Sequence, residues 1–376
     1  MPETVAEILK AYQAGDATPA DIVARSFARL RGHDDPAMFI SLRDEKDVIA
    51  EAQALARGGD KSLPLYGVPV AVKDNIDVAG LPTTAACPAF LYSPGEDATA
   101  VARLRAAGAL VIGKTNLDQF ATGLVGVRTP YGIGRNLFDD KLIPGGSSTG
   151  SALAVGAGIV PLSLGTDTAG SGRVPAAYSN IVGLKPSLGL VSTAGVVPAC
   201  RTLDCVSVFA LTVDDAMTAL KAVAGADDAD PYSRPRAVSA AGAMPDGARL
   251  GVPSAGQRVF FGDRNSATAY DAALAKLSEL GANLVEIDME PFYETARLLY
   301  EGPWVAERYL AAKNLIDTAP ESLHPVTRQI IAAGARATAA DAFTAFYRLE
   351  ALRRARDRTF EAIDALALPT APTIYT

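Results

Sequence analysis

Two loops of small residues carry the side chains in this sequence that could act as nucleophiles. The first spans 145–151 (GGSSTGS) and the second 165–173 (GTDTAGSGR), with an apolar stretch between them. Glycine lets the backbone adopt conformations that a Cβ forbids, and it lets several N–H groups converge on a small ligand. Serines in such loops either attack a substrate or simply form turns, and the loops alone leave both interpretations open.

A serine nucleophile needs a base, and the sequence offers a lysine in place of the usual histidine. The two histidines, His33 and His324, lie beside acidic residues or proline, in contexts typical of solvated loops. Lys73 instead ends the apolar run 65–72. A lysine at the end of a buried strand loses hydration, which disfavours its ammonium form and can make it a base near neutral pH. The alternative is a lysine whose head reaches water.

Three segments taken together resemble the amidase signature family. Lys73 in VAVKDNIDV, Ser147 in GGSSTGSA and Ser171 in GTDTAGSGRVPA match its Ser-cisSer-Lys triad in order and spacing. The resemblance extends over nearly the whole chain. It implies an α/β fold with a mixed, largely parallel, twisted sheet covered by helices on both faces, and a cis peptide bond between Gly146 and Ser147.

The resemblance also implies a role for each residue of the triad and of the second loop. Ser171 is the expected nucleophile, and Ser147 is expected to pass its proton to neutral Lys73. Asp167 and Arg173 are expected to form a structural ion pair that braces the loop. The expected oxyanion hole consists of peptide N–H groups, those of Thr168, Ala169, Gly170 and Ser171.

Segments outside the triad resemble the allophanate hydrolases within that family; they are 75–90, 120–132, 195–212 and 298–309. In that subgroup a tyrosine and an arginine bind the substrate's carboxylate, and they match Tyr300 and Arg308. On one helix these two would be about two turns apart and roughly on one face, although the intervening Gly302-Pro303 favours a kink. The alternative is that Tyr300 packs in the core and Arg308 pairs with a neighbouring glutamate. Gly123 is expected to face the amide nitrogen through its backbone.

The function that this resemblance implies is hydrolysis of allophanate (urea-1-carboxylate) with release of ammonia, through an acyl-enzyme and without metal or organic cofactor. The implied context is urea or triazine-type nitrogen degradation, with partner enzymes from those routes. One alternative is a related amidase acting on a biuret-type ureide or malonamate, or a subunit of a tRNA-dependent amidotransferase. A second alternative is a non-catalytic scaffold that has kept the fold.

Composition excludes several other classes of protein. The 376 residues are 49% hydrophobic and 20% charged, with a net charge of −7, and no basic cluster argues for nucleic-acid binding. The three cysteines show no spacing typical of a disulfide framework or a zinc site. No signal peptide or membrane-length apolar run is present, so the cytoplasm is the expected location. The oligomeric state stays open, with a homodimer through the outer helices as one option.

The pattern of apolar residues predicts alternating helices and strands. The expected helices are 2–14, 19–31, 44–57, 98–107, 117–122, 174–178, 214–224, 266–280, 292–313, 324–333 and 339–366. The expected strands are 65–72, 109–112, 249–252 and 283–287, with strand-and-turn material at 181–199 and a strand-like 367–369. Residues 108–115 match the P-loop pattern, but an apolar strand occupies the positions where a phosphate-binding turn belongs, which argues against a nucleotide site.

The expected organisation is a single amidase domain over 1–376. It comprises outer N-terminal helices (1–60), the amidase signature core (61–235) and a βαβ unit with substrate-binding helices (248–376). Residues 225–246, rich in Ala, Asp, Pro and Ser, are expected to form a surface excursion. The C-terminal domain of full allophanate hydrolases is expected to be missing, and the chain is expected to end before the family's amidase core normally does.

Overall fold

The fold is that of a computed structural model, which describes residues 2–376. The chain forms two compact units. Unit 1 comprises Met1–Ser239, Leu310–Ile330 and Thr376, and unit 2 comprises Ala240–Tyr309 and Ile331–Tyr375. Each unit is described by itself below.

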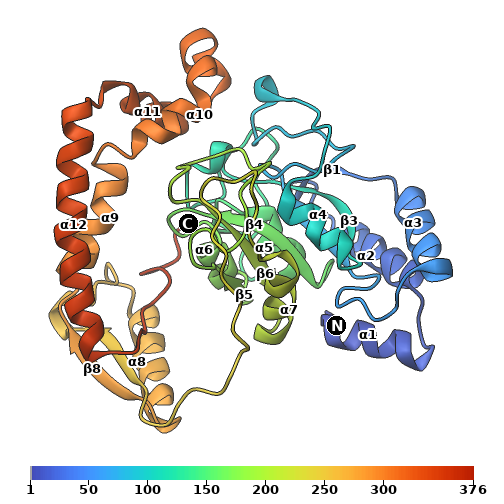
Figure 1. The fold of residues 1–376 in the computed structure, drawn as a ribbon, viewed down its shortest axis with the longest axis horizontal. Coiled ribbons are helices and arrows are strands. Elements are labelled where there is room, and N and C mark those ends of the chain that lie inside the picture. Colours follow the sequence, from blue (N-terminus) through green and yellow to red (C-terminus); the bar gives the residue numbers. More distant parts are fainter. Residues whose placement is uncertain (1) are drawn as a thin grey trace. The chain divides into compact units, whose positions relative to one another are not determined.

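Unit 1 is built on a six-stranded mixed sheet, drawn in blue to green in Figure 1. Its strands, in spatial order, are β1 (Phe39–Leu42), β3 (Leu110–Thr115), β2 (Pro69–Lys73), β4 (Leu162–Asp167), β6 (Cys205–Ala210) and β5 (Val182–Leu184). The central strands β3, β2 and β4 run parallel, whereas the pairs at both edges are antiparallel. The predicted mixed α/β sheet is therefore confirmed, with its parallel part at the centre.

Helices cover both faces of this sheet, because side chains alternate between the faces along each strand. In β2, Val70 and Val72 join one apolar cluster and Ala71 joins the other. The first cluster includes buried residues of α1 (Val5–Ala14), α4 (Thr99–Ala106) and α7 (Val213–Val223). The second includes buried residues of α2 (Pro19–His33), α3 (Glu45–Gly58), α5 (Thr149–Gly156) and α6 (Arg173–Tyr178).

Local sequence signals account for where the N-terminal helices begin. Thr18 accepts the N–H of Asp21, and the Asp21 carboxylate accepts the N–H of Thr18 in return, with Pro19 at the first helical position. This capping box satisfies backbone donors that the first turn leaves open. The predicted start of α2 at Pro19 is confirmed.

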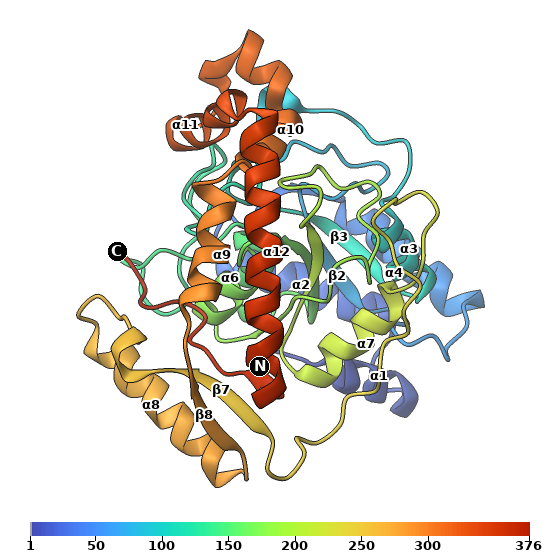
Figure 2. The same cartoon turned by 60° about the vertical axis from the view of Figure 1, so that its left-hand side comes forward.

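Unit 2 contains a three-stranded parallel sheet in the order β8 (Asn283–Ile287), β7 (Arg249–Pro253), β9 (Ala365–Leu366). Helix α8 (Arg264–Glu279) connects β7 to β8, which confirms the predicted βαβ unit. Helices α9 (Glu290–Tyr300) and α12 (Ala339–Ala362) lie side by side in Figures 1 and 2, and Glu294 of α9 pairs with Arg348 of α12. The boundary between the units falls within α10 (Val305–Thr318) and α11 (Pro325–Ala333).

Two predicted helices differ from the structure. The segment 117–122 contains only the short 3-10 helix η2 (Gln119–Ala121), because Phe120 and Ala121 adopt positive φ values near 51° that an α-helix excludes. The span 292–313 is two helices, α9 and α10. An added Cβ at Gly302 would lie 2.4 Å from the Leu298 carbonyl oxygen, and Pro303 has no N–H to donate, so the chain breaks there.

Two strands, β1 and β6, were not predicted, whereas the P-loop-like segment does form the predicted strand, β3. The remaining short helices are 3-10 turns, η1 (Pro88–Phe90), η3 (Ala255–Gln257), η4 (Pro320–Ser322) and η5 (Gly334–Arg336). Within residues 2–376, no helix combines the length and the apolar character needed to cross a membrane.

Candidate active site

The carboxyl ends of the three parallel strands meet at one edge of the unit 1 sheet. Lys73, the last residue of β2, is paired with Thr115, the last residue of β3. On the other side of β2, Val72 is paired with Leu164 of β4, which continues to Asp167. Ligands of open α/β sheets bind outside the carboxyl ends of strands. This edge is therefore where the sequence and the fold together place a site.

Lys73 and Ser147 are in direct contact there. The Lys73 Nζ donates hydrogen bonds to Ser147 Oγ and to Thr166 Oγ1, each over 2.7 Å. Lys73 and Ser147 are completely buried, and Thr166 is nearly so. The Gly146–Ser147 peptide bond is cis, as the resemblance implied. The alternative of a lysine whose head reaches water is excluded.

Ser171 lies in the loop between β4 and α6, and it is 3% exposed. Its hydroxyl donates to the Gly123 carbonyl oxygen over 3.4 Å, which places the backbone of Gly123 beside this hydroxyl. Its own carbonyl accepts the N–H of Ser148 over 3.1 Å, and that bond ties the two serine loops together. Lys73, Ser147, Ser171 and Gly123, all predicted site residues, are thus brought to one place.

Asp167 and Arg173 form the predicted ion pair across the second loop. Two Arg173 nitrogens each lie 2.9 Å from a different Asp167 oxygen, in the bidentate geometry that suits a guanidinium. Burial works to raise the pKa of the Asp167 carboxyl, but hydrogen bonds and charge from Arg173 outweigh it, so this pKa lies below its usual value. The hydrogen bond to Asp167 in turn raises the pKa of Arg173.

The same carboxylate uses one of the four N–H groups predicted for the oxyanion hole. Gly170 donates its N–H to Asp167 Oδ1 over 2.8 Å, so that group is not free for a substrate in this structure. Among the described residues, no hydrogen bond occupies the N–H groups of Thr168, Ala169 or Ser171. Three open donors on one turn form a concavity that favours a developing negative charge.

Several residues of the site were not predicted from the sequence. Thr166 fixes the lysine, and Asn75 in turn donates to Thr166 Oγ1 over 3.2 Å. The Asp204 carboxylate accepts the Thr168 hydroxyl over 2.5 Å and the Ala199 N–H over 2.8 Å, which anchors the start of the second loop. Asn75 follows Lys73 closely, a signal that could have been used, but Thr166 and Asp204 come from other segments.

A buried ion pair lies next to the lysine in the sequence. Asp74 and Lys114 are both fully buried, with 3.4 Å between carboxylate and ammonium. Asp74 also accepts the N–H and the hydroxyl of Thr84, and Lys114 donates to Pro82 O and Thr83 Oγ1. Burial raises the pKa of Asp74 and lowers that of Lys114, although each partner's charge opposes the shift of the other.

Tyr300 and Arg308, the predicted carboxylate-binding pair, belong to unit 2. Tyr300 ends α9 and is 40% exposed, so it does not pack in the core. Arg308 lies on α10 and is buried, with its guanidinium carbon 5.4 Å from the centre of the Tyr300 ring. The two residues share no helix face, contrary to the expectation. The break after α9 brings them into a cation–π contact instead.

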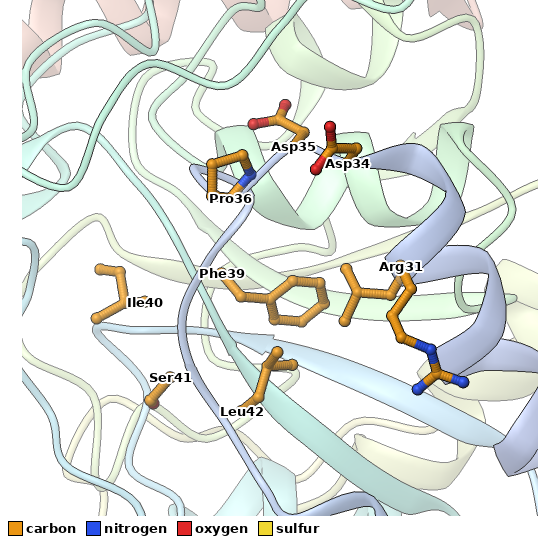
Figure 3. Close-up of a pocket in the computed structure, with 9 residues that line it drawn as sticks. Arg31, Asp34, Asp35, Pro36, Phe39, Ile40, Ser41 and Leu42 are labelled. Carbon is orange, nitrogen blue, oxygen red and sulfur yellow. The ribbon is translucent and has the colours of Figure 1, made fainter.

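Figure 3 shows a surface cavity of about 350 Å³ elsewhere in unit 1. It lies where α2 ends and the edge strand β1 passes, and its lining includes Arg31, Asp35, Phe39 and Leu42. None of the predicted site residues lines it. Among the described side chains, no group of three or more histidines, cysteines or carboxylates could hold a metal ion.

Comparisons with known proteins agree with this arrangement. The profile of the Amidase family matches residues 21–375. A urea amidolyase of Lachancea kluyveri is 50% identical over 343 residues, which are 90% of this chain and 19% of that protein. The structure of Kluyveromyces lactis allophanate hydrolase, in selenomethionine form, superposes with a TM-score of 0.91 at 46% identity, over 99% of this chain and 61% of that one.

A more distant group of relatives has another described role. One component of the glutamyl-tRNA(Gln) amidotransferase of Symbiobacterium thermophilum is 37% identical over 409 residues, covering 98% of this chain and 82% of that protein. The fold is therefore shared by chains that are named for different reactions. This chain spans less than a fifth of the urea amidolyase.

Proposed function

The chain belongs to the amidase family, and on that basis we propose that it hydrolyses allophanate, releasing ammonia through an acyl-enzyme on Ser171. The contact that carries this proposal is the 2.7 Å hydrogen bond between Lys73 Nζ and Ser147 Oγ, beside the Ser171 loop. The identity to urea amidolyase and allophanate hydrolase supports the choice of substrate.

In the proposed first step, Ser171 Oγ attacks the carbonyl carbon of the substrate's terminal amide. The Ser171 proton passes to Ser147 Oγ while the Ser147 proton passes to neutral Lys73 Nζ, so that charge develops on the lysine and on the substrate oxygen. Burial of Lys73 favours its neutral, basic form. The N–H groups of Thr168, Ala169 and Ser171 hold the oxyanion.

Collapse of the tetrahedral intermediate breaks the C–N bond. The proton held by Lys73 returns through Ser147 to the leaving nitrogen, which departs as ammonia, and Ser171 is left acylated. Water then attacks the acyl group with the same pair as base, and the product carries a carboxylate at each end. No step requires a redox or metal partner.

Tyr300 and Arg308 are the residues that we propose for recognition of the substrate's carboxylate. A guanidinium next to an aromatic face can bind a carboxylate by two hydrogen bonds. In a protein with a net charge of −7, an anionic substrate needs such a local cation. The cytoplasmic location, a homodimer and partner enzymes of urea or triazine degradation stay predictions.

The test is a comparison of substrates. Ammonia release is measured from allophanate, biuret, malonamate and a neutral aliphatic amide, with Ser171→Ala as the control. We expect turnover of allophanate that the substitution abolishes. Preferred turnover of a different amide would leave the Ser171 chemistry intact but would refute the substrate and the assigned roles of Tyr300 and Arg308.

A second candidate function, as part of a tRNA-dependent amidotransferase, is favoured by the coverage of the Symbiobacterium relative, of which the chain spans 82%. Glutaminase activity, measured as glutamate formed from glutamine, distinguishes the two. We expect none above the Ser171→Ala background.

A further inference from the structure

Asp118 is a completely buried carboxylate that no predicted role explains. Its Oδ2 accepts the N–H groups of Val125 and Gly126, over 3.1 and 2.9 Å. Its Oδ1 accepts the N–H of Arg128 over 2.9 Å. Three backbone donors satisfy a buried carboxylate without a cation, and together they fix the course of the chain from 123 to 128.

The backbone of the same residue holds the Ser147 loop. The Asp118 N–H donates to the Ser147 carbonyl oxygen over 3.1 Å. The carboxylate also lies against Gly146, because a Cβ added there would come within 2.2 Å of Asp118 Oδ2. Asp118 therefore contacts both residues of the cis peptide bond.

The loop that the carboxylate holds leads to the other serine. A Cβ added to Gly123 would lie 2.6 Å from Asp118 Oδ2, so this glycine packs directly on the carboxylate. The Gly123 carbonyl oxygen is the acceptor of the Ser171 hydroxyl. A shift of Asp118 would thus move the acceptor of Ser171 and the peptide of Ser147 together.

From these contacts we infer that Asp118 is a positioning residue for both serines. It sets the distance between the loop of Ser147 and the backbone that orients Ser171, without touching the substrate. The inference rests on the proposed function, since it takes these serines as the reacting pair. Geometric precision of this kind is valuable, because a displacement of about 1 Å between reacting groups can slow a reaction roughly a hundredfold.

The test variant is Asp118→Asn, which keeps the size of the side chain. An amide offers one acceptor oxygen in place of two and turns an N–H group toward at least one of the three donors. We expect kcat to fall roughly ten- to a hundredfold, with KM within about threefold of the wild type. The rate at which a fluorophosphonate labels Ser171 should fall in parallel.

Asp35→Asn is the matched control. Asp35 is also buried, and its carboxylate accepts the N–H groups of Ala37 and Arg135 over 3.0 and 2.8 Å, beside the cavity of Figure 3. It should lower the melting temperature without slowing the labelling of Ser171. Equal kcat in Asp118→Asn and the wild type would overturn the inference, as would the same loss of kcat in Asp35→Asn.

If Asp118→Asn shows no cooperative unfolding, Gly123→Ala decides the question, because its methyl group displaces the carboxylate from the other side. The same loss of kcat is expected, and an unchanged kcat would refute the inference. The labelling rate requires no substrate, and kcat is compared on whichever amide the wild type hydrolyses. A wrong substrate assignment would therefore not be mistaken for a failure of the Asp118 role.

Discussion

Lys73 Nζ lies 2.7 Å from Thr166 Oγ1 and the same distance from Ser147 Oγ, so one buried nitrogen is held between two hydroxyl groups from different segments. Thr166 lies near the end of β4, and Asn75 orients its hydroxyl from β2's side of the site. The lysine is therefore aimed at Ser147 by the strand next to its own.

Replacing Thr166 by valine should slow the reaction and leave the fold intact. Valine keeps the shape but cannot hold the lysine, so we expect kcat to fall roughly tenfold in steady-state assays. Thr115→Val is the control, because Thr115 is an equally buried threonine whose hydroxyl bonds to Ser151. Equal rates in the two variants would show that the Thr166 hydroxyl does not position Lys73.

The Asp74–Lys114 pair should be costly to break and less costly to remove. Lys114→Met leaves the Asp74 carboxylate buried without its cation, so we expect a loss of about 3 kcal/mol or more in the free energy of unfolding. Adding Asp74→Asn should recover part of that loss in urea denaturation. Arg31→Gln, which breaks an exposed pair with Glu45, should change little. Additive effects of Asp74→Asn and Lys114→Met would refute the coupling.

The Asp167–Arg173 pair makes stability depend on pH in a defined direction. The folded state lowers the pKa of Asp167 below its unfolded value of about 3.9, so the pair stabilises above that pH. The stabilisation is lost as the pH falls through the folded-state pKa. Arg173→Met should therefore lower the free energy of unfolding by about 1–2 kcal/mol at neutral pH.

The difference between wild type and Arg173→Met should shrink below about pH 4, where Asp167 becomes protonated in both proteins. Thermal melting at a series of pH values measures it. A difference that stays constant from neutral pH to pH 3 would contradict an ionised Asp167 in the pair.

Arg308→Lys tests recognition of the carboxylate. Lysine keeps the charge but loses the planar two-point contact and the stacking on Tyr300, so KM for allophanate should rise about tenfold. KM for any neutral amide that the enzyme accepts should stay within about threefold. An equal rise for both substrates would assign Arg308 a structural role.

How far the sequence predicts this site depends on whether the information is local. Lys73 after an apolar run and serines in glycine-rich loops are local features, and the structure brings them together as predicted. Thr166 and Asp118 act through contacts with segments distant in the chain, which no periodicity reveals. Their types are also ordinary for strand ends and loops.

Local signals were less informative where tertiary contacts determine the backbone. Phe120 and Ala121 adopt positive φ values in a segment that a helical pattern would cover, and Asp118 just before them accepts donors from the loop that follows. Gly302-Pro303 did indicate a disturbance of the helix. Only the structure shows that the break is complete and that Tyr300 and Arg308 meet across it.

The most direct test of the account is to map the serine that reacts with a fluorophosphonate. Peptide mass spectrometry of the labelled protein should find the adduct on Ser171, and Lys73→Ala should slow the labelling roughly a thousandfold, because the proton of Ser171 loses its acceptor chain. An adduct on Ser147, or labelling of Ser171 at the same rate without Lys73, would contradict the proposed mechanism.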